Sequence, residues 1–373
     1  MTNKVHILIV DAFREAGGEE EVAFYIYNSL PRSEYDVTLA GPKDSPYFQK
    51  KLPKQSEFLN VSLSGKFDFL SMLKIRKYVK ESNVDIVNVH GYIAGYIVRI
   101  ACCGLKTKVV WTMHVNVLDV PSIGKVKRII RSKIEGELNR FLTNEVVCVA
   151  EELKHVVEKQ RIRTPISVVY NGIDVSAFSD THKKTSFYVR RDNELVLGFV
   201  SRLSTQKGIN YLLKLAVVLR EEKVNYKMLI VGDGDQKSFI ESYIKKNQLE
   251  KNVTLYGFQK DVNNVLDSID VLLLPSLFEG FPMIILEALC SKTPVIASNV
   301  NGIPEVVKDN ENGFLVTPRD VSALYRAVLK YVQRPELIKI HGEKGHQTVI
   351  ENYSKDMMLS QYEKIFSSLV DVK

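Results

Sequence analysis

The sequence has 373 residues, of which 45% are hydrophobic and 25% are charged, with a formal net charge of +7. This length and balance indicate a soluble globular protein of two or three domains and exclude an intrinsically disordered chain. The positive charge and the pI near 8.9 suit polyanionic partners, such as a nucleotide diphosphate, an anionic lipid surface or nucleic acid.

The cysteines and the apolar runs indicate in which cellular compartment the protein is expected. Cys102, Cys103, Cys148 and Cys290 lie in apolar contexts, without the spacing of a disulfide framework or a zinc site. We expect all four to be small core residues in a reducing compartment. The apolar run of residues 5–10 is too short for a signal peptide, and no apolar segment approaches the ~18 residues that span a bilayer. The expected location is therefore the cytoplasm.

The first half of the chain predicts a series of buried strands separated by helices. Short apolar runs predict strands at residues 5–10, 37–40, 86–89 and 109–113. Gly17 and Gly18 follow the first strand and precede a helix predicted over residues 20–30. A glycine pair lets the amides of a helix N-terminus approach an anion closely. Because the full G-x-G-x-x-G fingerprint is missing, an ordinary strand-to-helix turn stays open as the alternative.

Two of the predicted strands run into histidines. His90 follows the strand of residues 86–89, and His114 follows the strand of residues 109–113. Ligands bind beyond the carboxyl ends of the strands in α/β sheets, so both histidines are candidates for a binding site. A purely structural histidine is the alternative at each position.

Two basic stretches interrupt this first half. They carry Lys66, Lys74, Arg76, Lys77 and Lys80 in one stretch, and Lys125, Lys127, Arg128, Arg131 and Lys133 in the other. Such faces with phenylalanine and leucine nearby suit docking on an anionic membrane surface, at roughly 1 kcal/mol per well-placed cation. A solvated helix face is the alternative. No nucleic-acid-binding motif accompanies the charges, so we expect no nucleic-acid partner.

The second half predicts another series of strands. These lie at residues 195–200, 227–231, 253–256, 271–274 and 294–297, and they alternate with helices. Two successive series of this kind predict an α/β protein with two Rossmann-like, doubly wound domains that face each other across a cleft. The predicted segments are a first domain over residues 1–178, a linker over 179–193, a second domain over 194–352 and a C-terminal helix over 353–373.

Charged residues follow the strands of this second half. Arg202 and Lys207 come after the first of these strands, where they could clamp a diphosphate, Arg by its planar fork and Lys as a point charge. Glu279 lies in the loop after residues 271–274, and Glu287 lies in the helix that follows. Ordinary loop cations and acids near a helix start are the alternative.

A competing motif follows the strand of residues 227–231. Asp233-Gly234-Asp235 matches the D-x-D pattern of metal-dependent GT-A enzymes, in which the acids bind a Mn²⁺ ion that bridges a donor diphosphate. Gly232 and Gly234 also make a plain turn. Because Arg202 and Lys207 could replace a metal in stabilising the leaving group, we expect no metal site.

The motifs together resemble a known family. E-G-F-P at residues 279–282, Glu287 eight residues after Glu279, T-P-V-I-A-S at 293–298 and G-I-P-E at 302–305 resemble the E-x7-E region of the retaining glycosyltransferases of family 4, which have the GT-B fold. S-R-L-x-x-x-K-G at 201–208, W-T-M-H at 111–114 and N-G-I-D at 171–174 are similar too, so the resemblance covers nearly the whole chain. Lys292 departs from the family's usual glycine, and Met283 stands where the family often has a polar or small apolar residue.

The resemblance implies a role for each motif. Glu279 would contact the donor sugar, Glu287 would hold the ribose hydroxyls, and His114 would reach toward the donor sugar. Arg202 and Lys207 would bind the donor diphosphate. The set expected to act in catalysis is His114, Arg202, Lys207 and Glu279. The expected donor-binding set is Gly17, Gly18, Arg202, Lys207, Gly232, Phe258, Glu279, Gly280, Phe281, Pro282 and Glu287.

The function implied is that of a retaining, metal-independent hexosyl transferase that needs no cofactor. It would move a sugar from a nucleotide-diphosphate sugar, expected to be a UDP-sugar, to a saccharide or lipid-linked acceptor for cell-surface polysaccharide or glycoconjugate. The first domain would bind the acceptor, the second domain the donor, and the C-terminal helix would cross back to the first. Two alternatives are a nucleotide-sugar 2-epimerase of the same fold and an inactive nucleotide-sugar-binding partner in an assembly complex. The E-x7-E pattern argues against the first, and the intact charged residues argue against the second.

Overall fold

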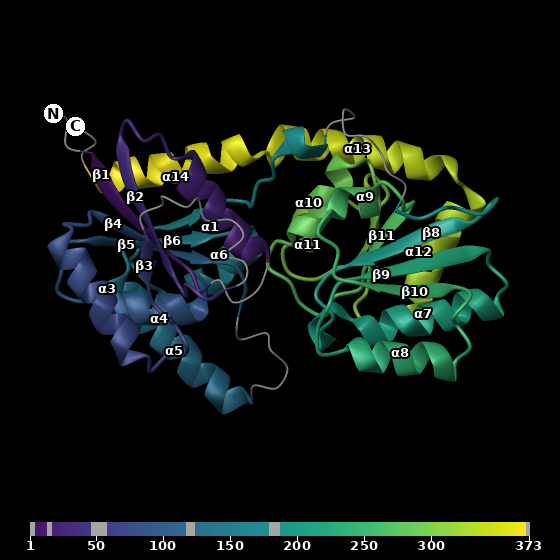
Figure 1. Cartoon of the computed structure of the whole chain (residues 1–373), viewed down its shortest axis with the longest axis horizontal. Helices are drawn as coiled ribbons and strands as arrows, with labels where there is room; N and C mark the ends of the chain where they lie inside the picture. The colour runs from purple at the N-terminus through teal and green to yellow at the C-terminus, as the bar shows by residue number, and fades with distance from the viewer. Residues whose placement is uncertain (1–3, 13–16, 46–57, 117–123, 179–186, 371–373) are drawn as a thin grey trace. The chain divides into compact units, whose positions relative to one another are not determined.

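The computed structural model describes residues 4–12, 17–45, 58–116, 124–178 and 187–370. Contacts divide the chain into two units, one of Met1–Gly172 with Lys355–Lys373 and one of Ile173–Ser354. Figure 1 shows a twisted sheet with helices on both faces in each unit. Part of the predicted linker, residues 179–186, lies outside the described residues. Within the described part of the chain, no helix is long and apolar enough to cross a membrane.

The first unit is built on a parallel sheet of seven strands in the order β3-β2-β1-β4-β5-β6-β7. The strands are β1 (Val5–Val10), β2 (Tyr35–Gly41), β3 (Phe58–Asn60), β4 (Ile86–His90), β5 (Lys108–Met113), β6 (Glu145–Cys148) and β7 (Ile166–Val168). The order changes direction between β1 and β4, the kind of switch point at which doubly wound sheets bind ligands.

Helices cover both faces of this sheet. On one face α1 (Gly18–Ser29) packs against α14 (Lys355–Leu369), and on the other α4 (Tyr92–Ala101) lies between α3 (Phe69–Glu81) and α5 (Lys125–Leu142). Helix α6 (Glu151–Glu158) connects β6 to β7. Tyr362 and Phe366 of α14 are fully buried in a core that also includes β1, β2 and α1. The last helix of the chain is therefore part of the first unit's core.

The second unit is built on a parallel sheet of six strands in the order β10-β9-β8-β11-β12-β13. The strands are β8 (Leu195–Val200), β9 (Tyr226–Val231), β10 (Val253–Gly257), β11 (Val271–Leu274), β12 (Val295–Ser298) and β13 (Gly313–Val316). Every residue of β9, β11 and β12 is buried, as continuous apolar runs in parallel sheets require. The two doubly wound sheets confirm the predicted fold class.

The helices of the second unit form two groups. One contains α7 (Ile209–Glu221), α8 (Lys237–Lys246) and α12 (Val321–Gln333), and the other contains α9 (Val262–Leu266), α10 (Met283–Cys290), α11 (Ile303–Val306) and α13 (Glu336–Asn352). Pro282 is the N-cap of α10.

One prediction about the cysteines is wrong. Cys102, Cys148 and Cys290 are buried, as expected for small core residues, but Cys103 is exposed. The reason is local, because α4 ends at Ala101 and Cys102 is its C-cap, so the chain turns toward the surface at the next residue. An apolar neighbourhood in sequence does not reveal where a helix stops.

Candidate functional site

The predicted site residues of the second unit follow neighbouring strands at one edge of its sheet. Arg202 and Lys207 follow β8, Gly232 follows β9, Phe258 follows β10, and Glu279 follows β11. These four strands are adjacent and parallel, so their carboxyl ends meet at the same edge. Motifs that are far apart in the sequence therefore lie close together at this edge of the sheet.

Lys207 and Glu279 form a direct ion pair at this edge. The Lys207 Nζ atom lies 2.7 Å from Oε1 of Glu279, and the two side chains are only 14% and 6% exposed. The Ser276 hydroxyl donates a second hydrogen bond of 2.7 Å to the same oxygen. A nearly buried pair of charges is tolerated because each compensates the other and further hydrogen bonds satisfy the carboxylate.

Backbone contacts between two loops hold this pair in place. The Leu277 amide donates to the Gln206 carbonyl at 2.8 Å, and the Gln206 side chain donates to the Phe278 carbonyl at 3.0 Å. Gly208 has a φ of +71°, and a Cβ there would come within 1.8 Å of the Pro275 carbonyl oxygen. The glycine after Lys207 is therefore needed for both its backbone conformation and its close approach to the loop after β11.

A third loop fixes the backbone of Glu279. The side-chain oxygen of Asn301, which follows β12, accepts a hydrogen bond of 3.1 Å from the Glu279 amide. Gly280 and Pro282 are buried, and Phe281 packs its ring against Tyr353 at a centroid distance of 5.4 Å. The E-G-F-P segment thus combines one charged side chain with three residues that pack inward.

The remaining predicted residues of this unit are more open to solvent. Arg202 is exposed, Phe258 is 60% exposed, and Glu287 is half-buried on α10. The structure therefore brings Lys207 and Glu279 into direct contact, while Arg202 and Phe258 present their side chains at the surface of the same edge.

The D-x-D motif forms a tight turn. Oδ1 of Asp233 accepts a hydrogen bond of 2.8 Å from the amide of Gly234, and Asp233 and Asp235 are both exposed. Gly232 and Gly234 have φ values of +139° and +154°, and a Cβ on either would collide with the loop after β8. These contacts account for the glycines by close packing. Among the described residues, no three His, Cys, Asp or Glu side chains gather as a metal site would require.

The first unit brings its two candidate histidines into contact. Nδ1 of His90 lies 2.9 Å from Nε2 of His114, and Nε2 of His90 lies 2.9 Å from Oδ1 of Asn88. All three side chains are buried. Burial lowers the pKa of His90 well below its usual value and lowers the pKa of His114 to about 3, so both rings are neutral near pH 7.

The glycine pair lies at the start of α1. Gly17 is the N-cap in an extended conformation, and Gly18 is the first helical residue. Glu19, the next residue, lies against the residue that follows His90, since a Cβ on Gly91 would come within 2.0 Å of Oε1 of Glu19. The start of α1 therefore lies beside the carboxyl end of β4.

Glu19 lies beside the candidate histidines, and the sequence did not reveal it. Burial and the neighbouring Glu20 carboxylate raise its pKa from 4.5 to about 8. A run of three glutamates at a helix start has an ordinary explanation in the helix dipole, so nothing in the sequence distinguishes Glu19 from its neighbours. Ser276, Asn301 and Asn88 were missed as well. Only Asn88 carried a signal, as a polar residue inside an apolar strand.

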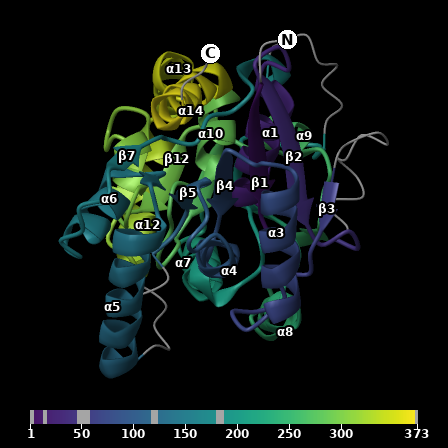
Figure 2. The same ribbon diagram turned by 90° about the vertical axis from the view of Figure 1, so that its left-hand side faces the viewer.

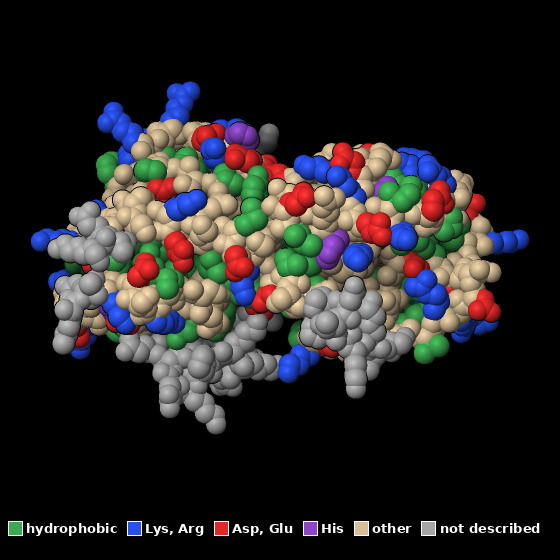
Figure 3. All heavy atoms as spheres, turned by 90° about the horizontal axis from the view of Figure 1, so that it is seen from above, with side chains coloured by type: hydrophobic (Ala, Val, Ile, Leu, Met, Phe, Trp, Pro, Cys, Tyr) green, Lys and Arg blue, Asp and Glu red, His purple; other side chains and the backbone are tan. Residues whose placement is uncertain are grey.

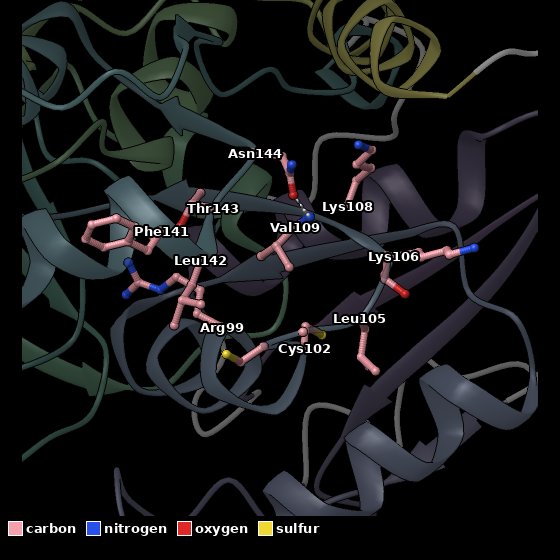
Figure 4. Close-up of a pocket in the computed structure, with 13 residues that line it drawn as sticks. Arg99, Cys102, Leu105, Lys106, Lys108, Val109, Phe141, Leu142, Thr143 and Asn144 are labelled. Atoms are coloured by element: carbon pink, nitrogen blue, oxygen red, sulfur yellow. Dashed lines mark hydrogen bonds between the residues drawn. The ribbon is translucent and has the colours of Figure 1, made fainter.

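A separate cavity of about 530 Å³ lies at the opposite end of β5 from His114. Figure 4 shows its wall, in which the Asn144 side chain accepts a hydrogen bond from the Val109 amide. Its lining includes Arg99, Cys102, Lys106, Lys108, Phe141 and Thr143. Because ligands of doubly wound sheets bind at the carboxyl edge, this cavity at the amino edge is not the predicted site.

Comparison with known protein families shows to which family this chain belongs. The family described as "Glycosyltransferase Family 4" matches residues 16–177, and the family described as "Glycosyl transferases group 1" matches residues 180–351. The chain belongs to the family 4 glycosyltransferases. The two matches follow one another along most of the chain, and each coincides with one of the two series of strands.

Relatives and solved structures agree with this assignment. An Escherichia coli protein named UDP-Gal:alpha-D-GlcNAc-diphosphoundecaprenol alpha-1,3-galactosyltransferase is 26% identical over 390 residues, which cover 99% of this chain and 98% of that protein. The N-acetyl-alpha-D-glucosaminyl L-malate synthase of Bacillus anthracis is 27% identical over 80% of this chain and 79% of its own. Anabaena HepE, solved with UDP and glucose, has a TM-score of 0.84 at 19% identity, covering 98% of this chain and 100% of its own. The fold is therefore GT-B, as predicted.

We predict that Lys207→Ala and Arg202→Ala separate stability from turnover. Removing Lys207 leaves a nearly buried carboxylate without its cation, so the free energy of unfolding should fall by about 3 kcal/mol. Arg202 is exposed, so its removal should lower stability much less than removal of Lys207 does. Both variants should lose ~10²-fold in sugar transfer, because each removes a preorganised charge. Urea unfolding and initial rates at saturating acceptor measure the two effects, and wild-type rates in both variants would contradict the assignment.

We also predict that Glu19→Gln stabilises the protein in a pH-dependent way. Because the folded pKa of Glu19 lies above its unfolded value, the folded protein binds more protons between about pH 4.5 and 8, and the contribution of Glu19 to stability falls as the pH rises through that window. The variant should therefore gain stability over the wild type at pH 8 and match it near pH 4.5. Urea midpoints at the two pH values test this, with Glu21→Gln as the control. An equal difference at both pH values would show that Glu19 does not titrate in this range.

Proposed function

We propose that this glycosyltransferase is a retaining hexosyl transferase that moves a sugar from a UDP-sugar to a saccharide or lipid-linked acceptor. The products would be cell-surface polysaccharide or glycoconjugate. The observation that carries the proposal is the Lys207–Glu279 ion pair at the carboxyl edge of the second sheet. It places a fixed cation and a carboxylate at the edge where α/β sheets receive nucleotides. The UDP donor is supported by the names of the Escherichia coli relative and the HepE complex.

The proposed chemistry begins with departure of the diphosphate. The bond between the anomeric carbon and the phosphate oxygen breaks, and the oxygen keeps the electron pair. Arg202 and Lys207 would stabilise the charge that develops on the diphosphate, in the way that preorganised donors stabilise transition states. The acceptor hydroxyl would attack the sugar from the face that the phosphate leaves and pass its proton to that phosphate, so that the anomeric configuration is retained.

The other predicted residues take supporting roles in this proposal. Glu279 would contact the donor sugar, and Glu287 would hold the ribose hydroxyls. The domain over residues 194–352 would bind the donor, while residues 1–178 would bind the acceptor and place His114 toward the sugar. No metal is needed in this scheme, because two side-chain cations serve the diphosphate. The Asp233 carboxylate already accepts a hydrogen bond within its own turn.

We predict that a UDP-sugar raises the melting temperature of the purified protein more than the matching GDP- or dTDP-sugar does. With that donor, NMR of the transferred sugar should show the anomeric configuration of the donor. Transfer should persist after exhaustive EDTA treatment. An inverted product would contradict the retaining mechanism, and loss of transfer with rescue by Mn²⁺ would favour a metal at Asp233 and Asp235. Interconversion of the UDP-sugar without transfer would indicate an epimerase.

An exposed surface of the first unit favours a membrane-bound acceptor. We call it the basic–apolar face, and it consists of residues on α3, on α5 and just before α3. Its apolar members are Phe67, Phe69, Leu70, Leu73, Val126, Ile129, Ile130, Ile134 and Phe141, which are between 44% and 78% exposed. Figure 2 shows α3 and α5 on either side of α4. Exposed apolar side chains that cluster on a helix, as they do on α3 and again on α5, mark an interaction surface.

Charge complementarity supports an anionic lipid surface as the partner. Lys74, Lys77, Lys127 and Lys133 are exposed beside these apolar residues; Lys125 is described only in its backbone. On the side of the molecule that Figure 3 presents, by contrast, acidic and basic side chains are interspersed. Lipid headgroups attract clustered lysines, and apolar side chains enter the acyl boundary. The proposed location is therefore the cytoplasmic face of a membrane.

We predict that the protein binds vesicles containing anionic lipid and is released as salt rises, because exposed charges are screened over about 10 Å at 0.1 M ionic strength. Lys127→Glu/Lys133→Glu should weaken binding about tenfold or more, and Phe69→Ser/Leu70→Ser should weaken it at every salt concentration. The control is Lys339→Glu/Lys344→Glu, which reverses two exposed charges on α13 of the second unit. Equal binding to neutral and anionic vesicles, or loss of binding in the control, would contradict this surface.

A further inference from the structure

A buried chain of polar side chains connects β4 to His114 in the first unit. Asn88 and His90 alternate with apolar residues along β4 and share one face of the sheet. The parallel register places Asn88 beside Val110 and His90 beside Thr112 of β5. Tyr362 of α14 reaches the same place, with its hydroxyl 3.3 Å from that of Thr112. These polar groups are excluded from water, so the direction of each hydrogen bond is constrained by the next.

The orientation of Asn88 is fixed by β5. Its amide nitrogen lies 3.5 Å from the Val110 carbonyl oxygen, which can only accept a hydrogen bond, and 3.2 Å from the Thr112 hydroxyl. The nitrogen must therefore face β5. The carbonyl oxygen of the side chain then faces His90, at 2.9 Å from Nε2. Since a carbonyl oxygen accepts only, Nε2 of His90 has to carry a proton.

The proton on His90 determines the proton on His114. A neutral imidazole carries one N–H, so Nδ1 of His90 is an acceptor. Its partner at 2.9 Å, Nε2 of His114, must then be the donor. The ring centroids are 5.2 Å apart and the planes are inclined by 29°, as for rings that meet through their nitrogens. In the part of the chain that the structure describes, no hydrogen bond is found at Nδ1 of His114.

We propose that Asn88 is a positioning residue that acts through His90 to hold His114 in its Nε2–H tautomer, so that Nδ1 of His114 accepts a hydrogen bond from a hydroxyl of the donor sugar. The last step rests on the proposed function, whereas the tautomer rests on the structure alone. The inference also bears on specificity. A bare ring nitrogen attracts a hydroxyl and repels a carboxylate, which has no proton to donate. The donor would therefore present a hydroxyl, not an acid group, to this histidine.

The desolvation of both rings supports a fixed tautomer. Burial disfavours the charged form of each histidine, and their mutual proximity disfavours it further at His90. If both rings were doubly protonated, two N–H groups would point at one another across 2.9 Å. With both rings neutral, only one N–H lies between them. Which of the two histidines donates it is then set by the Asn88 carbonyl, which accepts from the other nitrogen of His90.

The test is the protonation state of the His114 ring in the full-length protein. Nitrogen-15 NMR of ¹⁵N-histidine-labelled protein distinguishes protonated from bare ring nitrogens, and His114→Gln and His90→Gln assign the signals. We expect the proton of His114 on Nε2 and none on Nδ1 at pH 7. A proton on Nδ1 would overturn the proposal that Asn88 and His90 fix the tautomer of His114, whether or not the protein transfers sugar. If the tautomer is as expected but the protein uses no UDP-sugar as donor, the proposed function fails, while the assignment of the His114 tautomer stands.

Asn88→Leu tests whether the Asn88 side-chain carbonyl fixes the tautomer of His114. Loss of the carbonyl should leave His114 as a mixture of tautomers, and sugar transfer should fall about tenfold, the effect of one lost hydrogen bond. The matched control is Asn312→Leu, which removes another fully buried amide, in the second unit, and should leave the His114 signals unchanged. An unchanged tautomer in Asn88→Leu would show that Asn88 does not position His114. If that variant does not fold, the wild-type signals still decide the tautomer.

Discussion

The ion pair between Lys207 and Glu279 is the interaction on which the site of the second unit depends. Each partner comes from a different loop, and neither charge could stay in this nearly dry position without the other. The pairing forces the loops after β8 and β11 together, and Gly208 permits their close approach. An incoming diphosphate would meet a lysine already held in place. Little reorganisation would then accompany the departure of the leaving group.

The first unit also holds polar side chains in a buried position, but it does so without charged groups. Its sheet edge buries Asn88, His90 and His114 as a neutral chain in which every bond direction follows from the one before. Neutral groups would suit the sugar contact proposed for His114, because an uncharged ring can bind a hydroxyl without the desolvation penalty of an ion. Glu19 fits this pattern, since its raised pKa favours the protonated form beside Gly91.

Much of the fold follows from local patterns in the sequence. Continuous apolar runs such as residues 271–274 could be recognised as buried parallel strands, and charges placed just after them pointed to the sheet edge. Strands β3, β6, β7 and β13 were not predicted. β3 and β7 have only three residues each, none of them buried, so they lack the continuous buried apolar run that marks β11. Asn88, Ser276 and Asn301 were missed because their partners are defined by strand register and by contacts between loops. The surface position of Cys103 depended on where α4 ends.

The most direct measurement of the central claim is the affinity of the protein for UDP compared with uridine, by calorimetry, in the wild type and in Lys207→Met. If Lys207 and Arg202 bind the diphosphate, the wild type should prefer UDP by on the order of 10²-fold or more, since hydrogen bonds to charged groups contribute about 1.5–3 kcal/mol each. The preference should shrink at least tenfold in Lys207→Met, while the affinity for uridine stays the same. An unchanged preference for UDP in that variant would contradict the account.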